Sequence, residues 1–171
     1  FSYGINHATQ TKRQPGSSFK PIVYTAALEN GLYPAFPIIN QEFNYGGWNP
    51  HNFDNYTGGF MTLRDGIRTS ENLISARLII EGHVELWQVG RLASKLGIKT
   101  KLNLVPSISL GTSEVTLIEL TSAYATLANN GIYNEPISIL KIEDKDGIII
   151  DQFMHSSKEA LSAETTFLIT N

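Results

Sequence analysis

The chain has 171 residues, enough for one domain or a large part of one, and 42% of them are hydrophobic, which is enough to build a core. Its net charge is −3 and its Lys and Arg residues are scattered, so the charge pattern gives no indication of nucleic-acid or anionic membrane-surface binding. The absence of cysteine excludes disulfides and thiolate metal sites, and the four His residues have no metal-ligand spacing.

The beginning of the chain indicates a piece of a longer protein. Residues 1–3 carry neither an initiator Met nor a basic, apolar leader. No apolar run approaches the roughly 18 residues of a membrane-spanning helix.

Residues 13–21, RQPGSSFKP, form the most informative stretch. The Pro-Gly pair breaks the chain, and we expect a helix from Ser17 or Ser18 to about Asn30. Lys20 follows Ser17 by three residues, so the two side chains share a helix face and place a nucleophile next to a candidate base. Ser18 has Pro21 at the same spacing, which carries no base. The plain alternative is a Ser N-cap followed by a solvated Lys.

Residues 32–59 are rich in Gly, Pro and Asn and are predicted to form a long loop, which in a compact domain is usually functional. Trp48 and Phe53 lie within it. Such aromatic side chains either line a substrate groove or anchor the loop on the core.

Helices are predicted between about residues 62 and 131. Thr62 and Asp65 form a variant capping box at the start of a short helix, which must end before Ser70-Glu71-Asn72. A second helix, about 73–81, is hydrophobic on nearly all sides and is therefore expected to be buried.

A third helix is predicted over residues 84–96, with an apolar face. A fourth helix is predicted to begin at a second capping box. The apolar face comprises Val84, Trp87, Leu92 and Leu96. The full capping box of Thr116 and Glu119 precedes a helix that residues 129–131 close. Further on, Asp146-Gly147 between isoleucine-rich runs predicts a hairpin over 137–150, and residues 160–169 are weakly helical.

Three of these stretches resemble the transpeptidase domains of penicillin-binding proteins, most closely the bifunctional class A kind. They are the Ser17-x-x-Lys20 motif with its flanks, the Ser70-x-Asn72 motif with its Thr-Leu-Arg lead-in, and the segment Leu110–Gly131. The resemblance is good over Asn6–Gly131 and weak over the remainder.

The resemblance implies an α+β fold of the β-lactamase/transpeptidase type. Residues 1–171 would be part of a single domain, here a mostly helical fragment that lacks part of the central antiparallel sheet. Its parts would be an active-site helix at about 17–30, a helical region at about 62–131 and a strand hairpin at about 137–150.

The resemblance also implies a function, that of a peptidoglycan D,D-transpeptidase. Ser17 would form an acyl-enzyme with D-Ala-D-Ala stem peptides or with β-lactams, and Lys20 would be its base. Ser70 would relay a proton, Asn72 would bind the substrate amide and help to hold Lys20, and Trp48 would line the substrate groove. No cofactor or metal would be needed. The parent protein would be anchored in the cell membrane and face the extracytoplasmic side.

One expected element is absent, because no Lys-Thr-Gly motif occurs after Gly131. We expect it beyond Asn171, so the isolated chain should bind penicillin poorly and associate with itself or with a complementary fragment through exposed apolar surface. Two alternatives stay open. A serine β-lactamase would need a deacylating group, and no Glu-x-x-Leu-Asn pattern occurs. The other is a non-catalytic β-lactam sensor or pseudoenzyme, and the intact Ser17, Lys20, Ser70 and Asn72 argue against such degeneration.

Overall fold

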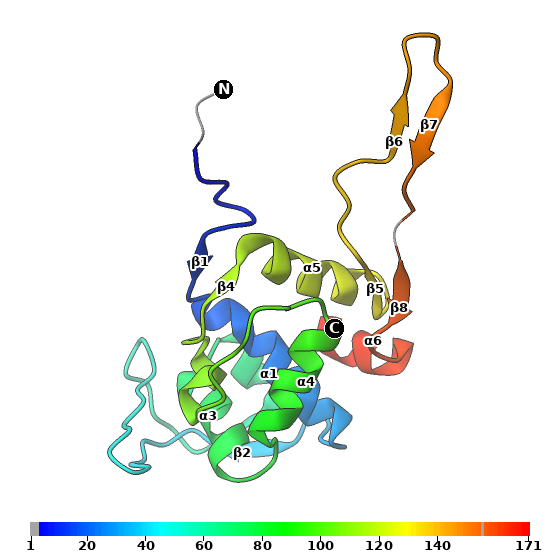
Figure 1. The fold of residues 1–171 in the computed structure, drawn as a ribbon. Coiled ribbons are helices and arrows are strands. Elements are labelled where there is room, and N and C mark those ends of the chain that lie inside the picture. The colour runs from blue at the N-terminus through cyan, green and yellow to red at the C-terminus, as the bar shows by residue number, and fades with distance from the viewer. Residues whose placement is uncertain (1–3, 155) are drawn as a thin grey trace.

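The computed structural model describes residues 4–154 and 156–171, which form a mostly helical body with short strands (Figure 1). The helices are α1 (Lys20–Glu29), α2 (Leu63–Arg68), α3 (Asn72–Ile80), α4 (Leu86–Lys95), α5 (Leu117–Ala128) and α6 (Ala163–Thr170), with 3-10 turns η1 (Gly16–Phe19) and η2 (Pro106–Leu110). This composition agrees with the α+β class predicted from the sequence.

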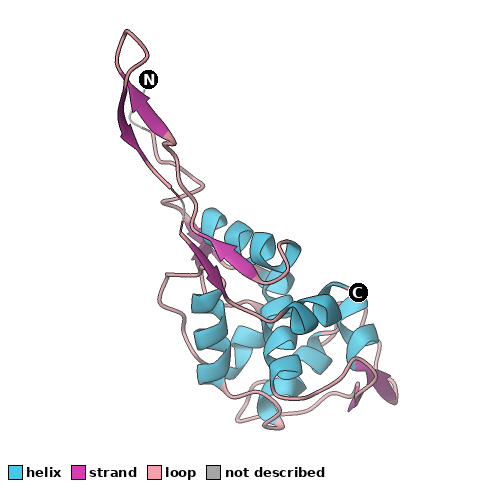
Figure 2. Ribbon diagram, turned by 90° about the vertical axis from the view of Figure 1, so that its right-hand side faces the viewer, coloured by secondary structure: helices cyan, strands magenta, loops and turns pink. Residues whose placement is uncertain are grey.

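The strands are short and form two-stranded antiparallel sheets, in which β1 pairs with β4, β2 with β3, β5 with β8 and β6 with β7. Their bounds are β1 (Lys12–Arg13), β2 (Pro37–Ile39), β3 (Phe60–Thr62), β4 (Val115–Thr116), β5 (Ile132–Asn134), β6 (Lys141–Glu143), β7 (Ile149–Gln152) and β8 (Ser157–Glu159). The predicted hairpin is thus confirmed as β6 and β7, and Figure 2 shows it projecting from the helical body.

Helix α1 is the centre of the core, where it contacts α2, α3, α4 and α6. Its residues from Ile22 to Ala27 are all buried, because they are almost entirely apolar and leave the helix no polar face. Helix α3 is buried for the same reason, as the sequence predicted. The helix that carries Lys20 is therefore held from several sides.

The predicted helix starts at Thr62 and Thr116 are confirmed. The Thr62 hydroxyl accepts from the Asp65 backbone N–H at 3.0 Å, and the Glu119 carboxylate accepts from the Thr116 backbone N–H at 2.9 Å. These bonds satisfy N–H groups that have no partner inside the helix. The helix starts are fixed locally, within four residues of sequence.

Helix α4 differs from its prediction. It begins at Leu86, not Val84, because Glu85 and Gln88 form a capping box that was not predicted. Trp87 is 55% exposed, so its assignment to the apolar face was wrong, and the buried residues of α4 are Val89, Leu92 and Ala93.

The long loop predicted over 32–59 is shorter in the structure, because β2 pairs with β3 and closes its base. Asn40 bonds through its backbone to both Gly58 and Gly59 at that base. Phe53 is fully exposed, so the interpretation that it anchors the loop on the core was wrong. Within the described ranges, no helix is both long and apolar enough to cross a membrane.

Candidate active site

The segment around Ser17 forms a 3-10 turn, η1, and the α-helix begins only at Lys20. The predicted helix start at Ser17 or Ser18 is corrected accordingly. The Lys20 backbone N–H donates to the Ser17 carbonyl, and in a 3-10 turn the side chains at i and i+3 lie one above the other. Ser17 and Lys20 therefore project from the same side of the turn.

A long-range contact holds this turn. Gly16 lies in the left-handed region at φ 58°, and its N–H donates to the Gly111 carbonyl at 3.1 Å. Gly111 is itself at φ 72°, and a Cβ added there would lie 2.0 Å from the Gly16 carbonyl oxygen. The close approach of these two backbones thus requires glycine at 111.

Gly111→Ala is expected to lower the free energy of unfolding by about 2–4 kcal/mol, because it adds a backbone clash to an unfavourable φ. Gly147→Ala is the matched control: Gly147 has a similar φ of 80°, but a Cβ there meets nothing within 4 Å. Urea unfolding of both variants measures the difference. Equal losses would show that the contact with Gly16 adds nothing.

The two serines of the turn have different surroundings. The Ser17 side chain is exposed, whereas the Ser18 hydroxyl donates to the Pro15 carbonyl at 2.6 Å. Ser18 is thereby engaged in holding the turn. Ser17 is the serine available to react with a molecule from solvent.

The Lys20 side chain is only 1% exposed and is held by oxygens of the Ser70–Asn72 turn, fifty residues away in the sequence. Its Nζ donates to the Ser70 carbonyl at 2.5 Å and to Asn72 Oδ1 at 2.7 Å, and it lies 3.0 Å from Ser70 Oγ. The structure therefore brings Lys20, Ser70 and Asn72 together, with Ser17 on the same side as Lys20.

Burial lowers the pKa of Lys20 from 10.5 to about 8, and the Glu71 carboxylate opposes part of that shift. The three oxygens can accept from the three N–H groups of the ammonium. The neutral amine keeps the bonds to the Ser70 carbonyl and Asn72 Oδ1, which only accept, and its lone pair can accept from the Ser70 hydroxyl. A lysine in this setting can take up a proton near neutral pH.

Ser70 reaches Lys20 because α2 ends in a Schellman motif. The Ser70 N–H donates to the Ile67 carbonyl and the Glu71 N–H donates to the Gly66 carbonyl. The residue after the helix cap adopts the left-handed conformation in this motif, and here it is Ser70, at φ 60°. The turn places both the carbonyl and the hydroxyl of Ser70 beside the Lys20 amine.

Trp48, the remaining predicted site residue, is not part of this cluster in the described structure. It is half-buried, packs edge-to-face on Phe43 with ring centroids 6.1 Å apart, and exchanges backbone hydrogen bonds with Tyr45. Its role in lining a substrate groove stays a prediction.

The sequence interpretation missed buried polar residues behind the motif. Asn40, Asn52 and Glu71 are each at most 6% exposed. Asn residues in a Gly- and Pro-rich loop are typical of turns, so their sequence context did not indicate burial.

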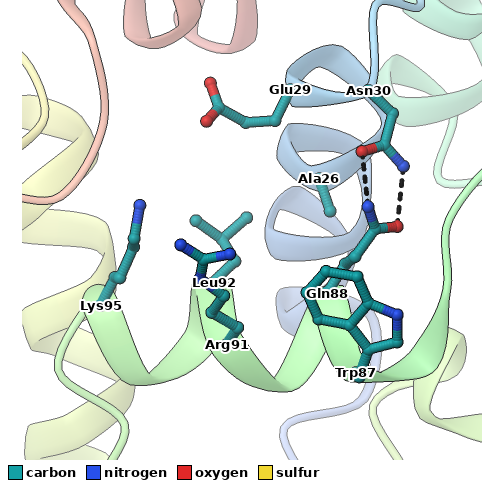
Figure 3. Close-up of a pocket in the computed structure, with 8 residues that line it drawn as sticks. All are labelled: Ala26, Glu29, Asn30, Trp87, Gln88, Arg91, Leu92 and Lys95. Atoms are coloured by element: carbon teal, nitrogen blue, oxygen red, sulfur yellow. Dashed lines mark hydrogen bonds between the residues drawn. The ribbon is translucent and has the colours of Figure 1, made fainter.

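A groove lies between α1 and α4, and Figure 3 shows its lining. The Asn30 and Gln88 amides bond to each other there in both directions at 2.8 Å. The lining residues are Ala26, Glu29, Asn30, Trp87, Gln88, Arg91, Leu92 and Lys95. They include none of the predicted site residues, so this groove is distinct from the cluster at Lys20.

One known protein family matches nearly the whole chain. Residues 3–171 match the model of the penicillin binding protein transpeptidase domain. The chain belongs to this family. Its membership confirms the resemblance seen in the motifs.

Relatives include penicillin-binding protein 1A of Rickettsia typhi, 38% identical over 92% of this chain, and penicillin-binding protein 1A of Neisseria lactamica, 35% identical over 84%. The chain spans about a fifth of the length of those relatives.

Solved structures confirm the transpeptidase-like fold class. Penicillin-binding protein 1A from Haemophilus influenzae matches with a TM-score of 0.87 and 27% identity, over 96% of this chain and 30% of that one. PonA1 from Mycobacterium tuberculosis, in complex with penicillin V, matches with a TM-score of 0.88 and 22% identity, over 99% of this chain and 48% of that one.

Proposed function

We propose that this chain is part of a peptidoglycan D,D-transpeptidase domain that works through a serine acyl-enzyme. One observation carries the proposal: Ser70 and Asn72 both contact the buried Lys20 amine. Ser17 projects from the same side of the 3-10 turn η1 as Lys20. A solvated lysine beside a helix cap would have no such partners. Family membership supports the same assignment.

In the first half-reaction, the Ser17 hydroxyl oxygen adds to the carbonyl of the penultimate D-alanine of a stem peptide. Its proton passes to the Lys20 amine, which the pKa of about 8 leaves partly neutral. The bond to the terminal D-alanine then breaks. The Ser70 hydroxyl, 3.0 Å from Lys20 Nζ, relays the proton to the leaving nitrogen, and D-alanine departs.

In the second half-reaction, the amine of another stem peptide attacks the Ser17 ester. The amine loses a proton to Lys20 and forms the cross-linking amide as the ester bond breaks. The proton returns to the Ser17 oxygen, so the enzyme ends as it began. Asn72 keeps Lys20 in place and binds the substrate amide. A β-lactam reacts in place of the stem peptide in the first half-reaction and leaves an ester on Ser17 that hydrolyses slowly.

The proposal includes the wider organisation expected from the sequence. The chain is one part of a single transpeptidase domain, in a parent protein anchored in the cell membrane with this domain on the extracytoplasmic side. Its partners are stem peptides and β-lactams, and the chemistry uses no cofactor. A Lys-Thr-Gly segment outside the 171 residues completes the substrate pocket.

The test is D-alanine release from a D-Ala-D-Ala stem peptide by the full-length protein, with an acceptor amine present, together with turnover of a chromogenic β-lactam. D-alanine release with a cross-linked product and slow β-lactam turnover are expected. Rapid β-lactam hydrolysis would indicate a β-lactamase instead. A penicillin adduct without D-alanine release would indicate a sensor.

The pH dependence of acylation provides a further prediction. At pH 7 about a tenth of Lys20 is neutral, so the penicillin acylation rate should rise with pH, with a midpoint near 8, and level off above about 9. A carboxylate favours the charged ammonium, so Glu71→Gln should lower the pKa of Lys20 and move the midpoint to lower pH.

Stopped-flow acylation across pH measures both curves. Glu143→Gln, on the exposed hairpin, is the control and should leave the midpoint in place. A rate independent of pH between about 7 and 9, roughly a unit on each side of the Lys20 pKa, would contradict the role of Lys20 as the base.

A further inference from the structure

Two buried asparagines lie in the loop between β2 and β3. Asn40, at the base of the loop, is 0% exposed and Asn52, in its second half, is 4% exposed. A buried amide costs free energy unless its hydrogen-bonding groups have partners. The hydrogen bonds of Asn52 therefore show to which parts of the chain this loop is fixed.

The Asn52 side chain connects three parts of the chain. Its Nδ2 donates to Asn40 Oδ1 at 2.8 Å and to the Tyr56 carbonyl at 2.7 Å. Its Oδ1 accepts from the Leu73 backbone N–H at 3.0 Å, in the first turn of α3. Glu71, the cap residue of α3, makes no side-chain cap bond, so Asn52 supplies this cap from another segment.

His51, the residue before Asn52, binds the Asn72 side chain through its backbone carbonyl. The His51 carbonyl accepts from Asn72 Nδ2 at 2.8 Å, while Asn72 Oδ1 accepts from Lys20 Nζ at 2.7 Å. Because the amide is planar, fixing its nitrogen end on His51 directs its oxygen end to Lys20. One N–H of Asn72 remains for a substrate.

We propose that Asn52 is a positioning residue for the reaction: it fastens the loop to the start of α3, so that the His51 carbonyl holds the Asn72 amide with its oxygen on Lys20. This inference rests on the proposed function and deepens it. Asn52 acts through Asn72 and touches neither substrate nor Ser17.

A double-mutant cycle in the full-length protein tests this. Asn52→Ala should lower the penicillin acylation rate by about 10- to 100-fold, the cost of misplaced catalytic groups. In an Asn72→Ala background the same change should have an effect of less than about threefold, because the group it positions is gone. Asn49→Ala, an exposed asparagine of the same loop, is the control and should stay within about twofold.

Equal fold-losses in the two backgrounds would overturn the proposal, as would an Asn52→Ala variant with the wild-type rate. If Asn52→Ala fails to fold, Asn52→Asp takes its place in the cycle. It keeps an acceptor for Leu73 but loses both N–H donors, and the same pattern is expected.

A measurement that does not depend on the acyl-enzyme separates the two proposals. If the wild-type protein forms no penicillin adduct, the proposed function fails, and the side-chain amide of Asn72 is then followed by NMR in the full-length protein labelled with ¹⁵N at asparagine. Its resonances should shift and its hydrogens exchange faster in the Asn52 variant than in Asn49→Ala. An unchanged Asn72 amide would overturn the positioning role.

Discussion

Replacing Ser17 with alanine is expected to abolish covalent labelling of the full-length protein by penicillin. Loss of the nucleophile costs a serine enzyme roughly 10⁶-fold in rate, well below detection in a labelling assay. The structural reason is that Ser17 is exposed and lies on the side of the turn that carries Lys20. Mass spectrometry of the labelled peptide provides the measurement.

Ser18→Ala is the matched control. The Ser18 hydroxyl already donates to the Pro15 carbonyl, so its removal affects the turn and should leave most of the labelling. A penicilloyl group found on Ser18 would show that the assignment of the nucleophile is wrong.

The Lys20→Arg variant is expected to be nearly as damaging as Lys20→Ala, with a loss of roughly 10²- to 10⁴-fold in acylation rate. A guanidinium keeps the positive charge but cannot lose its proton at ordinary pH, so it cannot act as a base. It also brings a planar group into a site where three oxygens converge on a single nitrogen. Stopped-flow acylation with penicillin measures the rates.

Lys95→Arg is the control, because Lys95 is exposed at the end of α4, away from the cluster. An Arg variant at position 20 that acylates at nearly the wild-type rate would indicate that Lys20 serves only through its charge. Thermal unfolding of each variant checks that the loss is not one of stability.

Features that depend on a few neighbouring residues could be predicted from the sequence. The helix starts at Thr62 and Thr116 follow from cap bonds within four residues, and the β6–β7 hairpin follows from its Asp-Gly turn. The placement of Ser17 and Lys20 on one side of the turn is equally local, since a spacing of three residues puts side chains on one side in either kind of helix. The serine and lysine of the candidate site were therefore predictable.

Features that depend on distant partners could not be predicted in this way. The 3-10 turn at Ser17 depends on Gly111, and the orientation of Asn72 depends on the His51 carbonyl. Burial of Asn52 depends on partners that the fold alone supplies. Trp87 and Phe53 show the converse, because large apolar side chains were expected to be buried and are exposed.

The left-handed turn at Ser70 limits which amino acids this position can accept. Glycine adopts φ 60° without strain but has no hydroxyl, whereas threonine has the hydroxyl but is β-branched and resists that conformation. Asparagine tolerates the conformation but replaces the hydroxyl with a larger amide. Folding alone therefore favours glycine at position 70, and under the proposed function it is proton transfer with Lys20 that requires serine there, at a cost in stability.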